Sequence, residues 1–116
     1  MSASAREFTA GPDPYGATWN VRFLWLQNGI SIRHADTIDC KFVVDDGSGP
    51  REMVLALPHP VLRQMHQRLG QPLSDAWCMK LAAAHLRHIA ASGEDAEKTL
   101  ITLSPEDLDR ANKTLQ

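Results

Sequence analysis

The sequence has few cysteines, no long apolar run and no large excess of charge. Its two cysteines, Cys40 and Cys78, lie in apolar surroundings without a CxxC spacing, which excludes a disulfide scaffold and fits a reduced intracellular pair. Apolar runs reach about four residues, far below the ~20 needed to cross a bilayer. The first residues lack the basic start and apolar core of a signal peptide, so we expect a cytoplasmic protein.

The formal net charge of −2 gives no reason to expect nucleic acid or a membrane surface as a partner. Charge is nevertheless uneven along the chain. Residues 59–92 carry a local charge of +3 and residues 93–109 a local charge of −5. These segments either attract each other, within the fold or between subunits, or form two solvated helix faces of different composition.

Hydrophobic residues at 43% and charged residues at 22% are typical of a globular domain. The chain of 116 residues suffices for one domain. Residues 1–17 contain the breaker sequence Gly11-Pro12-Asp13-Pro14 and are expected to form a flexible arm, which leaves residues 18–116 as a single domain.

An antiparallel β-meander of three or four strands is predicted for residues 18–57. Asn28-Gly29 between two apolar runs favours a tight hairpin turn. That turn would place His34 and Asp36 on the apolar side of the hairpin, and Leu24 and Leu26 on the other. The apolar side would hold Trp19, Val21, Phe23, Trp25, Ile30, Ile32 and Ile38. Residues 30–45 fit either one bent strand or two strands.

The second half of the sequence predicts helices. One covers Val61–Leu69 and ends at Gly70, and the next is capped by Ser74 or Asp75 and runs to about Ala91. Residues 99–103 form an edge strand or an extended connector. Ser104-Pro105-Glu106-Asp107 then begins a terminal helix. The expected fold class is therefore α+β: the meander, two packed helices, a short extended segment and a C-terminal helix.

Histidine is the residue type that suggests a site. A polar pocket rim between sheet and helices is predicted from Arg33, His34 and Asp36, with His85 of the central helix completing it. Alternatively, a β-bulge turns His34 and Asp36 outward, or the two form a structural hydrogen bond. His85 and His88 have an i, i+3 spacing that suits a metal ion, but their places on the helical wheel favour core or core-edge residues.

Other chemistries are disfavoured. Cys40, His34 and Asp36 could supply a nucleophile, a base and an acid, yet residues 34 and 40 lie ~20 Å apart on a straight strand. DNA binding by the two helices as a helix-turn-helix motif is disfavoured, because the second helix lacks an exposed polar face for DNA bases. We expect no cofactor and no metal, and binding rather than catalysis.

The leading hypothesis is a small cytoplasmic interaction module that forms a homodimer through its sheet or terminal segment. It rests on the apolar residues found on both sides of the hairpin and on the opposed local charges. The alternative is a small ligand-binding protein or enzyme with a polar pocket at His34 and Asp36, whose ligand the sequence does not identify.

Overall fold

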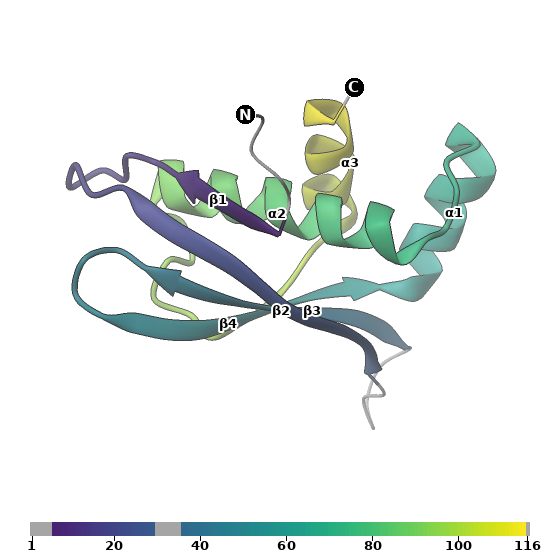
Figure 1. The fold of residues 1–116 in the computed structure, drawn as a ribbon. Helices are drawn as coiled ribbons and strands as arrows, with labels where there is room; N and C mark the ends of the chain where they lie inside the picture. The colour runs from purple at the N-terminus through teal and green to yellow at the C-terminus, as the bar shows by residue number, and fades with distance from the viewer. Residues whose placement is uncertain (1–5, 30–35, 116) are drawn as a thin grey trace.

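A computed structural model describes residues 6–29 and 36–115. A five-stranded sheet lies below three helices, as Figure 1 shows, and the strand order β1-β2-β3-β4-β5 follows the chain. The first four strands are antiparallel neighbours, and the last is parallel to β4. The α+β class and the order of meander before helices are confirmed. The strands and helices are β1 Glu7–Ala10, β2 Trp19–Gly29, β3 Thr37–Asp45, β4 Pro50–Pro58, α1 His59–Leu69, α2 Asp75–Ser92, β5 Leu100–Thr102 and α3 Pro105–Thr114.

The helix boundaries follow the local signals in the sequence. Ser74 accepts a hydrogen bond from the Trp77 amide and caps α2, and Gly93 ends that helix in the left-handed conformation with φ 76°. Ser104 and Asp107 form a reciprocal capping box at the start of α3. Gly70 ends α1 in the same left-handed way, with φ 71°.

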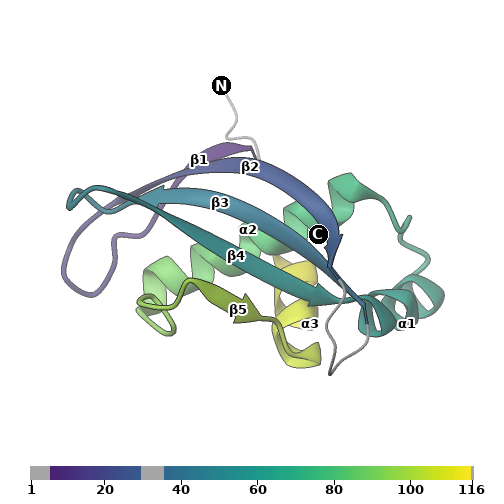
Figure 2. The same ribbon diagram turned by 90° about the horizontal axis from the view of Figure 1, so that it is seen from below.

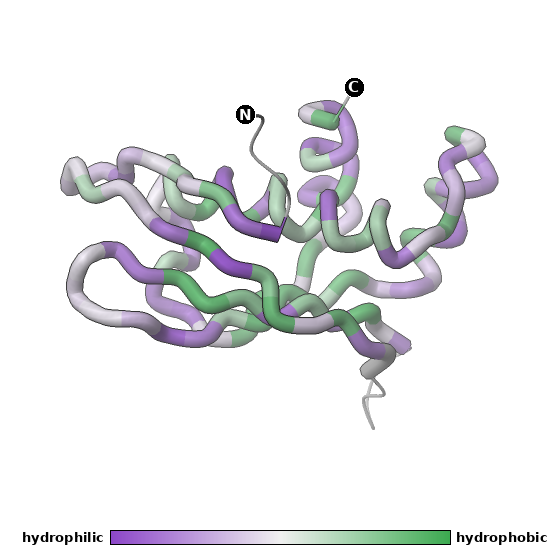
Figure 3. The backbone as a smooth tube through the Cα atoms, viewed as in Figure 1, coloured by the Kyte–Doolittle hydropathy of each residue, from purple (hydrophilic) through white to green (hydrophobic). Residues whose placement is uncertain are grey.

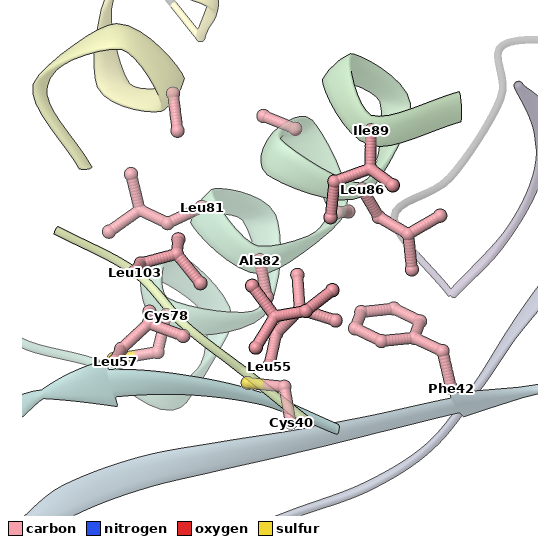
Figure 4. Close-up of a cluster of buried hydrophobic side chains, with 14 of the residues drawn as sticks. Cys40, Phe42, Leu55, Leu57, Cys78, Leu81, Ala82, Leu86, Ile89 and Leu103 are labelled. Atoms are coloured by element: carbon pink, nitrogen blue, oxygen red, sulfur yellow. The ribbon is translucent and has the colours of Figure 1, made fainter. Parts of the chain in front are cut away.

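The core lies between one face of the sheet and α2 (Figure 4). Side chains of β3 and β4 point up from the sheet toward α2, whose leucines and Ile89 point down between them. Phe42 is fully buried and packs edge-on against Phe8 at 6.4 Å and Phe23 at 5.5 Å between ring centroids. The tube coloured by hydropathy shows apolar stretches along the central strands and α2, with more polar turns at the ends (Figure 3).

The predicted tight turn at Asn28-Gly29 is wrong. These residues belong to β2, where they pair with Ile38 and Thr37. The observed register places Val21 opposite Val44. The tight turn would instead have put acidic Asp36 opposite Val21 on a core face, which costs free energy without a polar partner.

A β-bulge at Leu24 changes which side of the sheet the following residues occupy. Phe23 pairs with Phe42 and Trp25 with Lys41, so Leu24 is the extra residue. Beyond it Leu26 pairs with buried Cys40 and packs against the core, whereas Trp25 lies on the opposite face with Lys41. The predicted apolar face is therefore wrong for Trp25 and Leu26. Ile38 is buried as expected, and Ile30 and Ile32 lie outside the described residues.

Residues 7–10 belong to the sheet rather than to a flexible arm. Phe8 and Ala10 of β1 are buried in the core, and their alternation with exposed neighbours is the two-residue period of a half-buried strand. The loop that follows is ordered by Asp13, whose carboxylate accepts hydrogen bonds from the Tyr15 and Ala17 amides and from Nε1 of Trp19. Residues 99–103 contribute the parallel edge strand β5, and β3 begins at Thr37.

Candidate functional site

The structure describes two of the four residues of the predicted pocket, Asp36 and His85, and places them in different parts of the fold. Arg33 and His34 lie outside the described residues. Asp36 is exposed just before β3, and its backbone carbonyl accepts a hydrogen bond from the His59 amide at 2.9 Å. His85 lies in the middle of α2 and lines a pocket to which the strands contribute nothing. Asp36 therefore belongs to the junction with α1, while His85 belongs to a different site.

That site is a pocket of about 380 Å³ between α2 and α3, here called the α2–α3 pocket. His85 is 4% exposed, and its ring stacks on that of His88, with 5.8 Å between centroids and 26° between planes. Two helix faces and the residue after α3 form its walls: Ala84, His85, Arg87, His88, Arg110, Ala111, Thr114 and Leu115.

Two features of the sequence hold α3 against α2. The capping box fixes where α3 begins, and the buried Asn112 side chain accepts a hydrogen bond from Nε1 of Trp77 at 3.2 Å. Leu108 and Ala111 are buried on the stripe that the sequence predicts for this helix. The pocket is thus framed by packed helices rather than by loops.

Basic groups outnumber acidic ones along the pocket wall. Arg87 places its guanidinium 4.2 Å from the Phe8 ring centroid and forms no ion pair within the described part of the chain. Arg110 pairs with Asp107 at 2.6 Å. His88 lies 3.6 Å from a Glu94 carboxylate oxygen, too far for a hydrogen bond.

Burial lowers the pKa of His85, and the neighbouring His88 and Arg110 lower it further, against the opposing effect of Asp107. Burial alone would raise the pKa of Asp107. The Ser104 hydrogen bonds, the nearby His85 and the bond from Arg110 together hold it below its usual value. His85 is consequently biased toward its neutral form, and Asp107 toward its carboxylate.

Sequence reasoning found His85 and the His85–His88 spacing but missed the partners on α3. Arg110 and Thr114 are four residues apart on the helix that packs against α2, so an i, i+4 search of α3 for polar side chains would have found them. Which face of α3 meets His85 depends on packing between distant segments. Within residues 6–29 and 36–115, no group of three or more His, Cys, Asp or Glu side chains could hold a metal ion.

The sheet face away from the helices is a second candidate surface. Seen from below in Figure 2, the strands lie in front and α2 and α3 behind them. Trp25, Lys41, Val54 and Leu100 are neighbours in register across β2, β3, β4 and β5. We call these four residues the cross-strand row. A shallow hollow of about 540 Å³ lies nearer β1, between side chains that include Arg22 and Asp45.

The two cysteines are core residues. Burial raises the pKa of Cys40 to about 12 and that of Cys78 to about 11, and both thiols are free. A thiol needs a lowered pKa and access to act as a nucleophile, so neither group suits that chemistry.

No protein-family model matches the chain, and neither the curated proteins nor the solved structures contain a match. None of the helices in the described part of the chain is long and apolar enough to cross a membrane.

Proposed function

We propose that this chain is a non-catalytic interaction module of the cytoplasm that self-associates through the outer face of its sheet. The observation that carries the proposal is the cross-strand row, which places large apolar side chains on a sheet face without a helix over it. Trp25 is 36% exposed and Leu100 is 61% exposed. Large exposed apolar side chains on an open sheet face are typical of protein–protein contact surfaces.

The row has a tryptophan at one end and a leucine at the other. A two-fold axis parallel to the strands, between β3 and β4, carries β2 of one copy over β5 of the other. Each Trp25 then meets the partner's Leu100, and this contact occurs twice. Such reciprocal pairing of unlike residues is the defining property of a two-fold interface. A second copy of the chain therefore fits this face.

Charges on the face agree with that arrangement. Lys41 lies at the centre of the row, where its ammonium is 5.3 Å from the Trp25 ring centroid and 2.7 Å from a Glu52 carboxylate oxygen. The same two-fold axis carries β3 over β4 of the partner. Lys41 then lies over the partner's Val54, and the partner's Glu52 follows two residues along the same strand, about 7 Å away and within reach of the long lysine side chain.

The two cysteines support the non-catalytic role and the cytoplasmic location. Because Cys40 and Cys78 are buried with raised pKa values, they favour a structural role over nucleophilic catalysis. Two free thiols are also what a reducing compartment such as the cytoplasm maintains.

Reciprocal cross-linking tests the arrangement. A Trp25→Cys chain is mixed with a Leu100→Cys chain and treated with a bis-maleimide whose spacer is about 10 Å long, while the buried native cysteines stay unreactive. Facing sheets pack about 10 Å apart, which exceeds the about 4.4–6.8 Å between Cα atoms that a disulfide allows but lies within reach of this spacer, so the mixture should form a linked dimer. The control is Gln67→Cys, an exposed position on α1 that should link to neither chain. Absence of the mixed product, or equal linking to the control, would refute the proposed interface.

A further inference from the structure

We propose that the α2–α3 pocket is a binding site for a small organic anion, one that joins a phosphate or carboxylate group to a short apolar body. This site lies on the helical side of the molecule and is independent of the outer sheet face. Its volume of about 380 Å³ lies within the usual range for small-molecule sites.

The anionic group is recognised by the basic side chains of the wall. Arg87 and Arg110 come from two different helices, and a guanidinium matches the planar geometry of an oxyanion. Arg87 stacks on the Phe8 ring but has no carboxylate partner among the described residues, so no acidic group neutralises its charge. Asp107 pairs with Arg110 through one carboxylate oxygen, and its other oxygen accepts a hydrogen bond from the Ser104 amide. The Asp107 amide in turn donates to the Ser104 hydroxyl.

The two histidines supply unmet hydrogen-bonding capacity. Nδ1 of His85 and Nε2 of His88 are buried, and neither has a hydrogen-bond partner in the described part of the chain. Buried polar atoms in folded proteins are nearly always paired, so two unpaired nitrogens on residues that line the same pocket call for an explanation, which the Glu94 carboxylate, 3.6 Å from Nε2 of His88, does not supply. A bound oxyanion accepts hydrogen bonds and accounts for it.

The apolar body of the ligand is recognised by small and aliphatic side chains of the same wall. Ala84 and Ala111 leave room between the helices, and Leu115 closes one side. Alanines on packed helices leave space that a larger residue would fill. The pocket therefore selects against highly hydrated ions that carry no apolar part.

Titration with three probes tests the site: phenyl phosphate, benzoate and benzyl alcohol. Amide chemical shifts in a ¹H–¹⁵N spectrum locate binding, and calorimetry measures affinity. At least one of the two anions should bind saturably and shift amides of residues 84–88 and 110–115, and the tighter anion identifies the preferred oxyanion. Benzyl alcohol, which lacks the charge, should bind at least about tenfold more weakly. Failure of both anions to bind at these residues would overturn the proposal.

Variants separate charge from packing. Arg87→Gln should weaken anion binding at least about tenfold, because a charge-assisted hydrogen bond is lost, whereas Arg87→Lys keeps the charge and most of the affinity. Arg63→Gln on the exposed face of α1 removes the same charge elsewhere and is the matched control. Thermal unfolding confirms that each variant is folded. An equal loss with Arg63→Gln would show attraction to net charge alone and refute a specific site.

Discussion

The hydrogen bond between Trp77 and Asn112 should be the main polar link between α2 and α3. Both side chains are buried, and Nε1 of Trp77 donates to Oδ1 of Asn112 at 3.2 Å. Replacing Asn112 with Leu keeps the side chain's approximate size but leaves the indole N–H buried without a partner. An unpaired buried donor costs about 1–3 kcal/mol, so we expect the free energy of unfolding to fall by that amount.

A double-mutant cycle isolates the bond from other effects of the substitution. Trp77→Phe removes the donor, and combined with Asn112→Leu it leaves no unpaired group. The double variant should therefore lose less stability than the sum of the two single variants, by about 1 kcal/mol or more. Urea unfolding followed by circular dichroism measures all four proteins.

The exposed Arg68–Asp109 pair provides a control on the same helix. The guanidinium and the carboxylate are 2.9 Å apart and both largely exposed, so Asp109→Ala should lower the free energy of unfolding by no more than about 1 kcal/mol. Additivity of the Trp77 and Asn112 substitutions within about 0.5 kcal/mol would refute the claim that this bond couples the helices.

Three further predictions concern the cap of α3, His85 and the cysteines. Ser104→Ala should lower the free energy of unfolding by about 1 kcal/mol in urea titrations, because the Asp107 amide loses its cap; no change would contradict this role. Since burial lowers the pKa of His85, the unfolded chain binds the proton more readily, and stability should fall as pH drops below about 6.5. Urea midpoints from pH 8 to pH 5 should flatten in His85→Gln, and parallel curves for the two proteins would contradict the prediction. Cys40 and Cys78 should react with a thiol reagent only after unfolding, and rapid reaction of the native protein would show that the core is open.

Local signals in the sequence were sufficient to place the helices. Ser74, Gly93 and the Ser104–Asp107 capping box act on neighbouring backbone groups, so their effects do not depend on the rest of the fold. The local sequence does not decide whether Thr99–Leu103 joins the sheet, because pairing with β4 depends on a segment more than forty residues away along the chain.

Strand register could not be predicted from the hairpin signal. Asn28-Gly29 favours a tight turn locally, but the sheet pairs buried Val21 with buried Val44 and partly buried Leu26 with buried Cys40, which is a different register. The bulge at Leu24 makes that pairing possible and reverses the faces of Trp25 and Leu26. The two-residue alternation of side chains is interrupted at such a bulge, so the sequence pattern alone predicts a core position for Trp25, which is exposed.

The candidate site was found only in part for the same reason. His85 was identified from residue type and helical position, but its neighbours Arg110 and Thr114 come from a helix about twenty-five residues later. The register of a tight turn at Asn28-Gly29 puts Asp36 on the core side of the hairpin, whereas the observed register leaves it exposed before β3. Which side chains converge on one pocket is decided by the packing of whole elements, and sequence spacing carries little information about it.

The most direct test of self-association is the molar mass in solution, measured by light scattering at tens of micromolar protein. We expect the wild-type chain to have twice the monomer mass of 12.8 kDa. Trp25→Lys, which adds a charge at the end of the cross-strand row, should shift the mass toward the monomer, while Arg63→Gln should leave it unchanged. A wild-type protein that is strictly monomeric, or a dimer that Trp25→Lys does not weaken, would contradict association through the outer sheet face.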